Sequence, residues 1–320
     1  MDVATMELPS LSHSPSSSGL LIASSSDAPP RPMPGCHLAR VHPSPVSNPV
    51  LVASSPVLEM IGVRWPGASA SAEEEAALAS VCSGNSLFPG ASSALAACYC
   101  GFQVVAARWE IGKEGEKEFG AFAGQLGDGA AMSLGCSPAD DKGMCWEVQL
   151  KGAGRTPFSR SADGRKVLRS TLREFLCSEA MHHLGIPTTR AAAVVSSDSI
   201  VDRDIKYDGN VRGEPCAVLT RVSRSFLRFG SFEITRHAHE SSGMAGPSPG
   251  QHEKLLLPLL RHTLQRHFSH LLEEGAKLEE QCVGMLREVT ARTALLVAKW
   301  QAVGFVHGVL NTDSKPSIHL

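Results

Sequence analysis

The sequence predicts an α+β protein with two lobes, a mixed β-sheet lobe followed by a helical lobe. Within Phe102–Phe232, short strand-like runs alternate with turns that contain Gly or Asp, and one clear helix interrupts them. A loop over residues 240–250 follows, rich in Ser, Gly, Pro and His. Apolar residues then recur at three-to-four spacing in Leu255–Leu272 and Lys277–Val303, and Gly304 is placed to end the second helix.

Three regions are expected along the chain. Residues 1–47 are rich in Ser and Pro and poor in aromatic and acidic residues, so they cannot bury enough apolar surface to offset the entropy of ordering. We expect them to be disordered, as a plain tail or as an organelle transit peptide, because Arg31 and Arg40 are present while acids are scarce. The sheet lobe is expected over 48–240 and the helical lobe over 251–320.

The overall composition excludes several classes of protein. Hydrophobic residues make up 42% of the 320, and 30 basic residues nearly balance 32 acidic ones, so nothing indicates a nucleic-acid or membrane-surface partner. The longest apolar runs, such as Thr293–Val297, are far shorter than the ~20 residues that cross a bilayer. The nine cysteines lack paired metal spacing, and Cys98 and Cys100 stand too close for a zinc knuckle. We interpret them as reduced thiols of an intracellular protein.

The segment 123–130 is the first candidate for ligand binding. It contains Gly124, Gly127 and Gly129, and glycines let the backbone approach a phosphate and direct N–H groups at its oxygens. An ordinary Gly-rich turn between two strands explains the same composition.

Lys151 stands at the end of a predicted strand over 146–151. The strand has a period of two, with Trp146, Val148 and Leu150 facing the core and Glu147, Gln149 and Lys151 on the other face. A strand lysine near a Gly-rich loop is how kinase-like folds hold ATP phosphates. A solvated lysine at a sheet edge is the alternative.

A helix is predicted from about Asp163, as its N-cap, to Leu184, with Gly185 and then Pro187 as its stop. Two glutamates on this helix, Glu174 and Glu179, are candidates to pair with Lys151. At 100° per residue neither is preferred, because each falls beside apolar residues of the helix. Each is equally compatible with an ordinary, partly solvated side chain.

Three further residues are candidates for chemistry. Arg221, on a predicted strand over Cys216–Val222, and Arg228 after it are suited to bidentate phosphate contacts, although surface arginines are as common. Asp313 ends a polar loop that follows the last helix. It is a candidate catalytic base or metal ligand, or part of a simple connection.

The order of these motifs and the residues within them resemble the selenoprotein O family of protein adenylyltransferases. The clearest match is Trp-Glu-Val-Gln-Leu-Lys-Gly-Ala-Gly-Arg and its continuation over 146–165. Others are Leu168–Arg190, with Arg-Glu-Phe at 173–175 and Gly-Ile-Pro-Thr-Thr-Arg at 185–190, then Leu219–Glu233 and Trp300–Asp313. The resemblance covers roughly Asn48 to Asp313.

The resemblance implies a protein-kinase-like, two-lobed fold that transfers AMP instead of phosphate. ATP is held in a flipped orientation, a Ser, Thr or Tyr hydroxyl of a protein substrate attacks the α-phosphorus, and pyrophosphate leaves. Lys151 would touch phosphate and pair with Glu174. The other implied nucleotide-binding residues are Gly127, Gly129, Asp163, Gly164, Arg221 and Arg228. Asp313 would accept the proton of the attacking hydroxyl.

The resemblance also implies cofactors and a location. ATP and Mg²⁺ or Mn²⁺ are the implied cofactors. Family members in eukaryotes are usually mitochondrial, and the Ser-rich N-terminus permits this location. Another organelle or the cytoplasm is the alternative.

The sequence departs from the family pattern at four places. Ala130 stands where the family has an arginine, and Phe102 where it has a histidine, with a fifteen-residue insertion over 104–118. Ser314 stands where the family has a metal-binding asparagine, so neither metal ligand is expected to be intact. The sequence after Asp313 no longer resembles the family. In family members the second metal-binding aspartate and the rest of the helical lobe lie C-terminal to this point. We therefore expect an incomplete helical lobe, with the insertion and the tail as gene-model or splicing artefacts.

Two other functions compete with AMP transfer. A non-catalytic nucleotide-binding fragment or pseudoenzyme fits a chain that keeps Lys151 and Glu174 but lacks the metal ligands. A conventional kinase would transfer the γ-phosphoryl group. The resemblance favours AMP transfer over phosphorylation.

Overall fold

The computed structural model describes residues 8–12, 19–23, 30–103, 121–140, 144–206 and 208–313. Its centre is a mixed β-sheet with the strand order β1-β2-β4-β7-β8-β11-β10-β3, and β9 pairs with β11. A second, two-stranded sheet is formed by β5 and β6. The β1–β2 pair is parallel and the remaining described pairs are antiparallel. The strands are β1 (Ile22–Ala23), β2 (Leu38–Val41), β3 (Val50–Ser54), β4 (Ala94–Ala97), β5 (Cys100–Gln103), β6 (Ala121–Gln125), β7 (Ala131–Cys136), β8 (Glu147–Lys151), β9 (Lys166–Val167), β10 (Arg190–Asp204) and β11 (Val211–Ser223).

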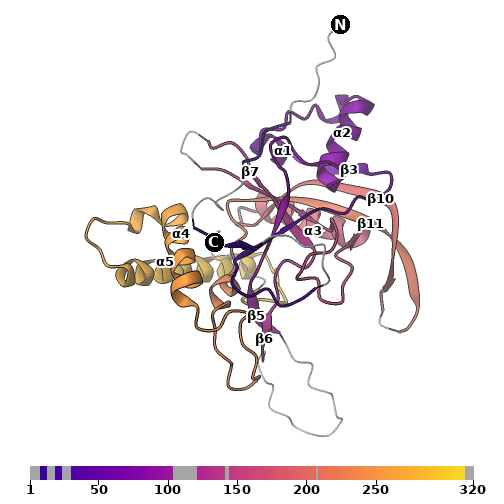
Figure 1. Cartoon of the computed structure of the whole chain (residues 1–320). Coiled ribbons are helices and arrows are strands. Elements are labelled where there is room, and N and C mark those ends of the chain that lie inside the picture. Colours follow the sequence, from indigo (N-terminus) through magenta and orange to yellow (C-terminus); the bar gives the residue numbers. More distant parts are fainter. Residues whose placement is uncertain are drawn as a thin grey trace.

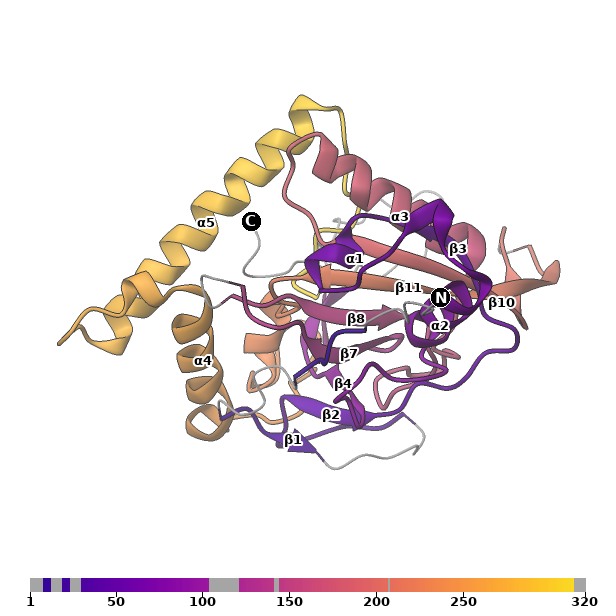
Figure 2. The ribbon, with the colours of Figure 1, turned by 90° about the horizontal axis from the view of Figure 1, so that it is seen from above.

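Helices lie beside the sheet and at one side of it. Figures 1 and 2 show α3 beside β10 and β11, and α4 and α5 together at one side of the sheet. The α-helices are α1 (Val57–Met60), α2 (Ala72–Ser83), α3 (Leu168–His183), α4 (Leu257–His267) and α5 (Leu278–Ala302), with short helical turns at Gly67–Ser69, Phe229–Glu233, His252–Leu256 and Ser269–Leu271. The expected α+β class, a sheet region followed by helices, is confirmed.

Separate hydrophobic clusters hold these layers together. The largest lies within and beside the sheet and includes Val148 and Leu150 of β8. A second joins α3 to the sheet, where Phe175 packs with Val194 and Leu219. A third holds α4 against α5. Burying apolar side chains contributes roughly 25 cal/mol per Å², so these contacts fix α3 on β10 and β11.

The expectation of disorder over residues 1–47 is wrong for its last part. β2 pairs along its length with β4, and its Ala39 and Val41 are buried in the main core. Leu11, Leu20 and other N-terminal residues are buried as well. Ser and Pro are compatible with extended segments at a sheet edge. The composition of this stretch therefore did not exclude strands that pack against apolar residues from the rest of the chain. The folded region therefore begins before Pro49.

The central helix also begins later than predicted. α3 starts at Leu168 with Val167 as its N-cap residue, because β9 occupies the two residues before it. The predicted stop is confirmed, since Gly185 adopts a left-handed φ of 72° directly after the C-cap residue Leu184. The predicted helices over 255–272 and 277–303 are observed as α4 with its flanking turns and as α5. None of the helices in the described ranges is long and apolar enough to span a membrane.

Candidate functional site

Lys151 and Glu174 form an ion pair between the sheet and α3. Lys151 Nζ lies 2.8 Å and 2.6 Å from the two carboxylate oxygens of Glu174. The side chain of Lys151 keeps 25% of its surface exposed, so a ligand can reach it. Phe175, the next residue of α3, is buried against the sheet, and this orientation brings Glu174 over the end of β8.

The other candidate glutamate has a different partner. The carboxylate of Glu179 lies 2.7 Å from Arg190 Nη2 and accepts a hydrogen bond from the backbone N–H of Ala191. Glu179 therefore ties the end of α3 to the start of β10. The structure assigns Glu174 to Lys151, a choice that the helical periodicity left open.

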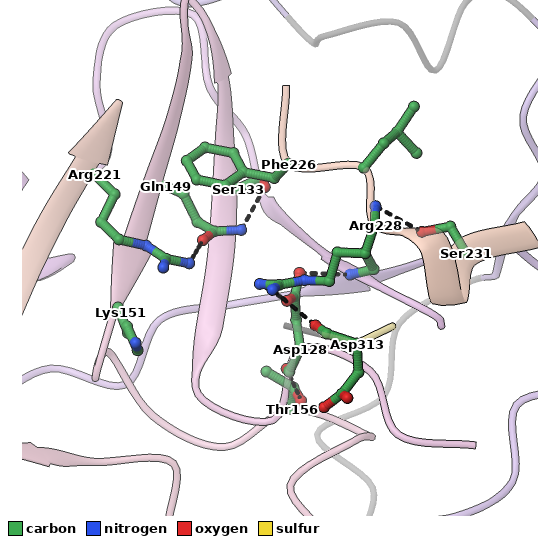
Figure 3. A network of polar contacts seen from close by, with 12 residues as sticks. Asp128, Ser133, Gln149, Lys151, Thr156, Arg221, Phe226, Arg228, Ser231 and Asp313 are labelled. Atoms are coloured by element: carbon green, nitrogen blue, oxygen red, sulfur yellow. Dashed lines mark hydrogen bonds and ion pairs between the residues drawn. The ribbon is translucent and has the colours of Figure 1, made fainter. Parts of the chain in front are cut away.

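Lys151 and Arg221 share one face of the central sheet. β8 and β11 are antiparallel, with Lys151 opposite Leu219 and Gln149 opposite Arg221, so side chains two residues apart point the same way. Arg221 Nη1 lies 3.3 Å from Glu174 Oε1, and its Nη2 donates to the side-chain oxygen of Gln149. Figure 3 shows this chain of contacts continuing to Ser133. Gln149 is fully buried, and sequence reasoning assigned it no role.

The charges of this cluster depend on its burial. Burial, and then the neighbouring guanidinium of Arg221, lower the pKa of Lys151 from its ordinary 10.5 to about 8. Burial alone would raise the pKa of Glu174, but Arg221 and Lys151 hold it below its ordinary value. One carboxylate thus faces two cations, which favours a bound anion at this place.

Arg228 connects the Gly-rich loop with Asp313. Its Nη2 lies 3.7 Å from Asp128 Oδ1, and its Nη1 donates to the backbone oxygen of Asp313 at 2.9 Å. The guanidinium also stands 4.9 Å from the centre of the Tyr99 ring. Figure 3 shows Arg228 directed toward Asp128 and Asp313, with Thr156 beside them. Thr156 holds the loop by donating to the backbone oxygen of Asp128 at 2.6 Å.

The loop glycines are required by close packing against Phe158. A Cβ on Gly127, whose φ is 90°, would stand 2.4 Å from the Phe158 ring, and one on Gly129 would stand 2.9 Å from the Phe158 backbone oxygen. The 127–129 loop is therefore a packed turn whose two glycines face a cavity. This is a structural reason for the glycines that holds with or without a phosphate.

This packing gives a stability prediction. Gly127→Ala is expected to destabilise the fold by about 2–4 kcal/mol, from left-handed strain and overpacking against Phe158. Gly185→Ala is the matched control, because Gly185 is also left-handed but no described residue lies within 4 Å of the added Cβ. It should cost about 1 kcal/mol. Urea unfolding of both variants measures the difference, and equal losses would contradict the packing explanation.

Asp163 and Gly164 belong to a turn before α3, not to the helix. Asp163 was predicted to be the N-cap, but its carboxylate accepts from the backbone N–H of Arg165 at 2.9 Å and pairs with Arg203 at 2.7 Å. Gly164 has a φ of 70°, and a Cβ there would stand 2.1 Å from the backbone oxygen of Gly154. Arg203, from the long strand β10, was missed because its partner lies 40 residues away.

Asp313 is held at the site by its backbone and its neighbours. Besides the Arg228 contact, Thr312 O accepts from Gly230 N at 2.9 Å, and Thr312 Oγ1 donates to Glu233 at 2.8 Å. One carboxylate oxygen of Asp313 is 3.4 Å from Gln103 Nε2, whereas Oδ1 is buried with no partner in the described part of the chain. Burial raises the pKa of Asp313 above its ordinary value. Ser314 and the insertion over 104–118 lie outside the described residues.

The predicted site residues divide between two adjoining cavities. Lys151, Glu174, Arg221 and Arg228 line a cavity of about 570 Å³, closed on one side by residues that include Trp300 of α5. A second cavity of about 670 Å³ is lined by Gly127, Gly129, Asp163, Gly164 and Asp313, together with Ala130 at the position where the family carries an arginine. Both cavities include Lys166 and Ser170 in their walls, so they meet beside the start of α3. Their sizes are those of small-molecule sites.

The fold and the cavities define an α+β protein with a basic cleft between its central sheet, α3 and the segment after α5. The chain belongs to the protein adenylyltransferase SelO family, whose sequence model matches residues 67–319. The resemblance noted from the motifs is thereby confirmed.

Curated relatives agree with this assignment. The chain is 52% identical over 289 residues to the human protein named "Protein adenylyltransferase SelO, mitochondrial", covering 89% of this chain and 40% of that one. It is 47% identical over 298 residues to the zebrafish (Danio rerio) "Protein adenylyltransferase SelO-1, mitochondrial", with the same two shares. It is 44% identical over 285 residues to "Protein nucleotidyltransferase YdiU" of Azoarcus sp. strain BH72, covering 89% and 48%. The chain thus spans less than half the length of these relatives.

Proposed function

We propose that the chain binds ATP in the basic cleft and forms the nucleotide-binding part of a protein adenylyltransferase. The observation that carries this proposal is the convergence of Lys151, Arg221 and Arg228 on one cavity, with Glu174 holding the first two. Three buried or half-buried cations beside a cavity are suited to a triphosphate. The names of the relatives, which are adenylyltransferases and nucleotidyltransferases, support ATP as the ligand.

The arrangement also supports a protein-kinase-like, two-lobed fold. A lysine on a central strand paired with a glutamate on the helix that packs on the sheet is the way in which protein kinases prepare for ATP phosphates. Lys151 on β8 and Glu174 on α3 have this relationship. The sheet lobe would comprise 48–240 together with the N-terminal strands, and the helical lobe 251–320.

In the proposed reaction a Ser, Thr or Tyr hydroxyl of a protein substrate attacks the α-phosphorus of ATP. A bond forms between the hydroxyl oxygen and this phosphorus, the bond to the bridging oxygen breaks, and pyrophosphate leaves. Lys151, Arg221 and Arg228 hold the phosphates and offset their charge. The Asp313 carboxylate accepts the hydroxyl proton, and its raised pKa suits it to that role, as does Oδ1, which has no hydrogen-bond partner among the described residues.

The described residues fit ATP better than they fit a metal ion. No group of three or more His, Cys, Asp or Glu side chains in the described ranges is arranged to hold a metal. Within the described part of the chain, Asp313 offers one oxygen without a hydrogen-bond partner, and a single carboxylate does not make a Mg²⁺ site. We therefore retain Mg²⁺ or Mn²⁺ as a proposed requirement of the reaction and assign no step to it. A mitochondrial location is likewise proposed, because relatives named mitochondrial match most of the chain.

The reaction is tested by incubating the chain with ATP, Mg²⁺ or Mn²⁺ and a general protein acceptor. One sample carries the label on the α-phosphorus and another on the γ-phosphorus. Label from the α-position on protein, with none from the γ-position, is the expected result. Label from the γ-position would mean phosphorylation and would overturn the proposal of AMP transfer.

A second candidate function is nucleotide binding without catalysis. Two observations favour it, the lack of a metal-binding group among the described residues and Ala130 in place of a cation on the loop. Binding of ATP with no transfer of either label would support this alternative. Both functions share the cleft and differ only in the chemistry at Asp313.

The pKa of Lys151 gives a pH prediction for ATP binding. Since this pKa is about 8 in the empty site, binding above pH 8 must take up a proton, whereas below pH 8 the lysine is already charged. Affinity should be flat up to about pH 8 and then fall by up to tenfold per pH unit. Isothermal titration from pH 7.5 to 9.5, in buffers of different ionisation enthalpy, measures both affinity and proton uptake. Lys151→Met should abolish this dependence, and an unchanged slope in that variant would contradict the assignment.

A further inference from the structure

Two cysteines lie side by side on the β7–β8 hairpin. Cys136 is the last residue of β7, and Cys145 precedes β8 by two residues. The register pairs Cys136 with Glu147, and Ser137 N donates to Trp146 O at 2.8 Å, so the pairing continues beyond the end of β7 and before the start of β8. Cys145 and Glu147 are two residues apart and share a face, which places Cys145 diagonally opposite Cys136 on that face.

One arginine of α4 contacts both sulfur atoms. Arg266 Nη2 lies 2.5 Å from the Sγ atom of Cys145 and 3.5 Å from that of Cys136. The Cys136 thiol also lies within hydrogen-bonding distance of the Cys145 sulfur, and Arg224 is a second nearby cation. Cys136 is buried, whereas Cys145 is partly exposed. Both are present as thiols, without a disulfide.

These contacts favour the thiolate form of Cys145. The hydrogen bond from Cys136 outweighs burial, and with the charges of Arg266 and Arg224 it lowers the pKa of the Cys145 thiol to about 6. The other described cysteines with a resolved shift have raised pKa values, chiefly through burial. A thiolate is the nucleophilic form of cysteine, and a neighbouring thiol can trap its oxidised product.

We propose that Cys145 and Cys136 form a peroxide-reactive dithiol, in which Cys145 is attacked first and Cys136 resolves it to a disulfide. The thiolate of Cys145 attacks one oxygen of hydrogen peroxide, the O–O bond breaks, and hydroxide leaves, which gives a sulfenic acid on Cys145. The Cys136 sulfur then attacks the Cys145 sulfur, an S–S bond forms, and water leaves with the Cys136 proton. Two thiols and one peroxide give one disulfide and two waters.

The site is separate from the proposed ATP cleft. Lys151 lies six residues along the hairpin from Cys145, roughly 20 Å at the rise of a strand. Neither cysteine lines either of the two cavities. The dithiol can therefore be tested whether or not the chain binds ATP.

Cys177 is the internal control for the test. It is exposed on α3, and solvent access alone would make it the most reactive thiol among the described residues. The electrostatic advantage of Cys145 is largest at low pH. At pH 6 about half of a thiol with a pKa of 6 is ionised, against about 0.3% of the cysteine in an unstructured model peptide. The lower nucleophilicity of the more acidic thiolate leaves a rate advantage of roughly tenfold.

The experiment treats the full chain at pH 6 with limiting hydrogen peroxide, blocks the remaining thiols and maps the peptides by mass spectrometry. The expected result is a Cys136–Cys145 linked peptide that accumulates about tenfold faster than Cys177 is oxidised. Cys136→Ser should instead leave a sulfenic acid on Cys145 that dimedone traps. Oxidation of Cys177 at an equal or faster rate would overturn the proposal, as would a wild-type chain in which Cys145 reaches sulfinic acid without the linked peptide. The comparison of Cys145 with Cys177 in the wild-type chain tests the proposal even if the Cys136→Ser variant does not fold.

Discussion

Lys151→Met is expected to weaken ATP binding by about 30- to 5,000-fold while leaving the chain folded. Removing one partner of a buried charge contact with a ligand costs about 2–5 kcal/mol. The fold should tolerate the change, because burial already disfavours the charged lysine and Glu174 keeps its contact with Arg221. Removing one partner of a buried ion pair is strongly destabilising when the other charge is left uncompensated, and here the carboxylate of Glu174 stays paired with Arg221. Isothermal titration with ATP and a thermal melt measure the two effects on one sample.

Lys299→Met is the matched control for this change. Lys299 lies on α5, is half-buried, donates to the backbone oxygen of Gly185, and lines neither of the two cavities. It should change the affinity for ATP by less than about twofold. If Lys151→Met bound ATP as the wild type does, the assignment of the phosphates to this cavity would be wrong. A loss of folding in Lys151→Met would contradict the predicted tolerance.

Asp313→Asn is expected to lower AMP transfer by about 10²- to 10⁴-fold, the usual contribution of a general base. ATP binding should stay within about threefold, because Arg228 is held by the backbone oxygen of Asp313, which the substitution leaves in place. The asparagine has nearly the same shape but cannot accept the hydroxyl proton. Label transferred from α-labelled ATP, measured beside ATP affinity, separates the two effects.

Asp198→Asn controls for the loss of a carboxylate as such. Asp198 is exposed at the sheet edge and accepts a hydrogen bond from Asn48, away from the cavities. It should transfer label at the wild-type rate. Transfer that survives in Asp313→Asn would remove Asp313 from the role of proton acceptor. Equal loss of transfer and of ATP binding would mean that its role is to hold Arg228.

The sequence predicted the parts of the fold that depend on local patterns. The period of two over 146–151, the apolar spacing of α4 and α5 and the glycine after α3 each act within a few residues, and each was observed. The N-terminal strands were missed because β2 has only four residues, pairs with β4 and packs its apolar side chains into the main cluster. A short strand whose partner lies more than 50 residues away leaves little signal in its own composition.

The candidate site was harder to predict for a related reason. The choice between Glu174 and Glu179 depends on Arg190, which the turn after α3 brings back to Glu179. Gln149 looked like an outward-facing residue because strand alternation cannot distinguish solvent from a buried polar cleft. Asp163 is of a residue type that is favoured at helix N-caps, but its carboxylate pairs with Arg203 from the long β10 strand instead. In each case the role of the residue depends on a partner from another element of the fold, and local sequence propensity carries no information about that partner.

Hydrogen–deuterium exchange of this chain with and without ATP shows directly whether the basic cleft is the nucleotide site. We expect slower exchange with ATP in peptides that cover both adjoining cavities. These include the 127–130 loop, the end of β8 at Lys151, the 160–174 segment and the end of β11 through Arg228. The β10–β11 hairpin tip should exchange at its original rate and serves as the reference. Protection confined to other segments, or no protection at saturating ATP, would contradict the claim that this cleft is the nucleotide site.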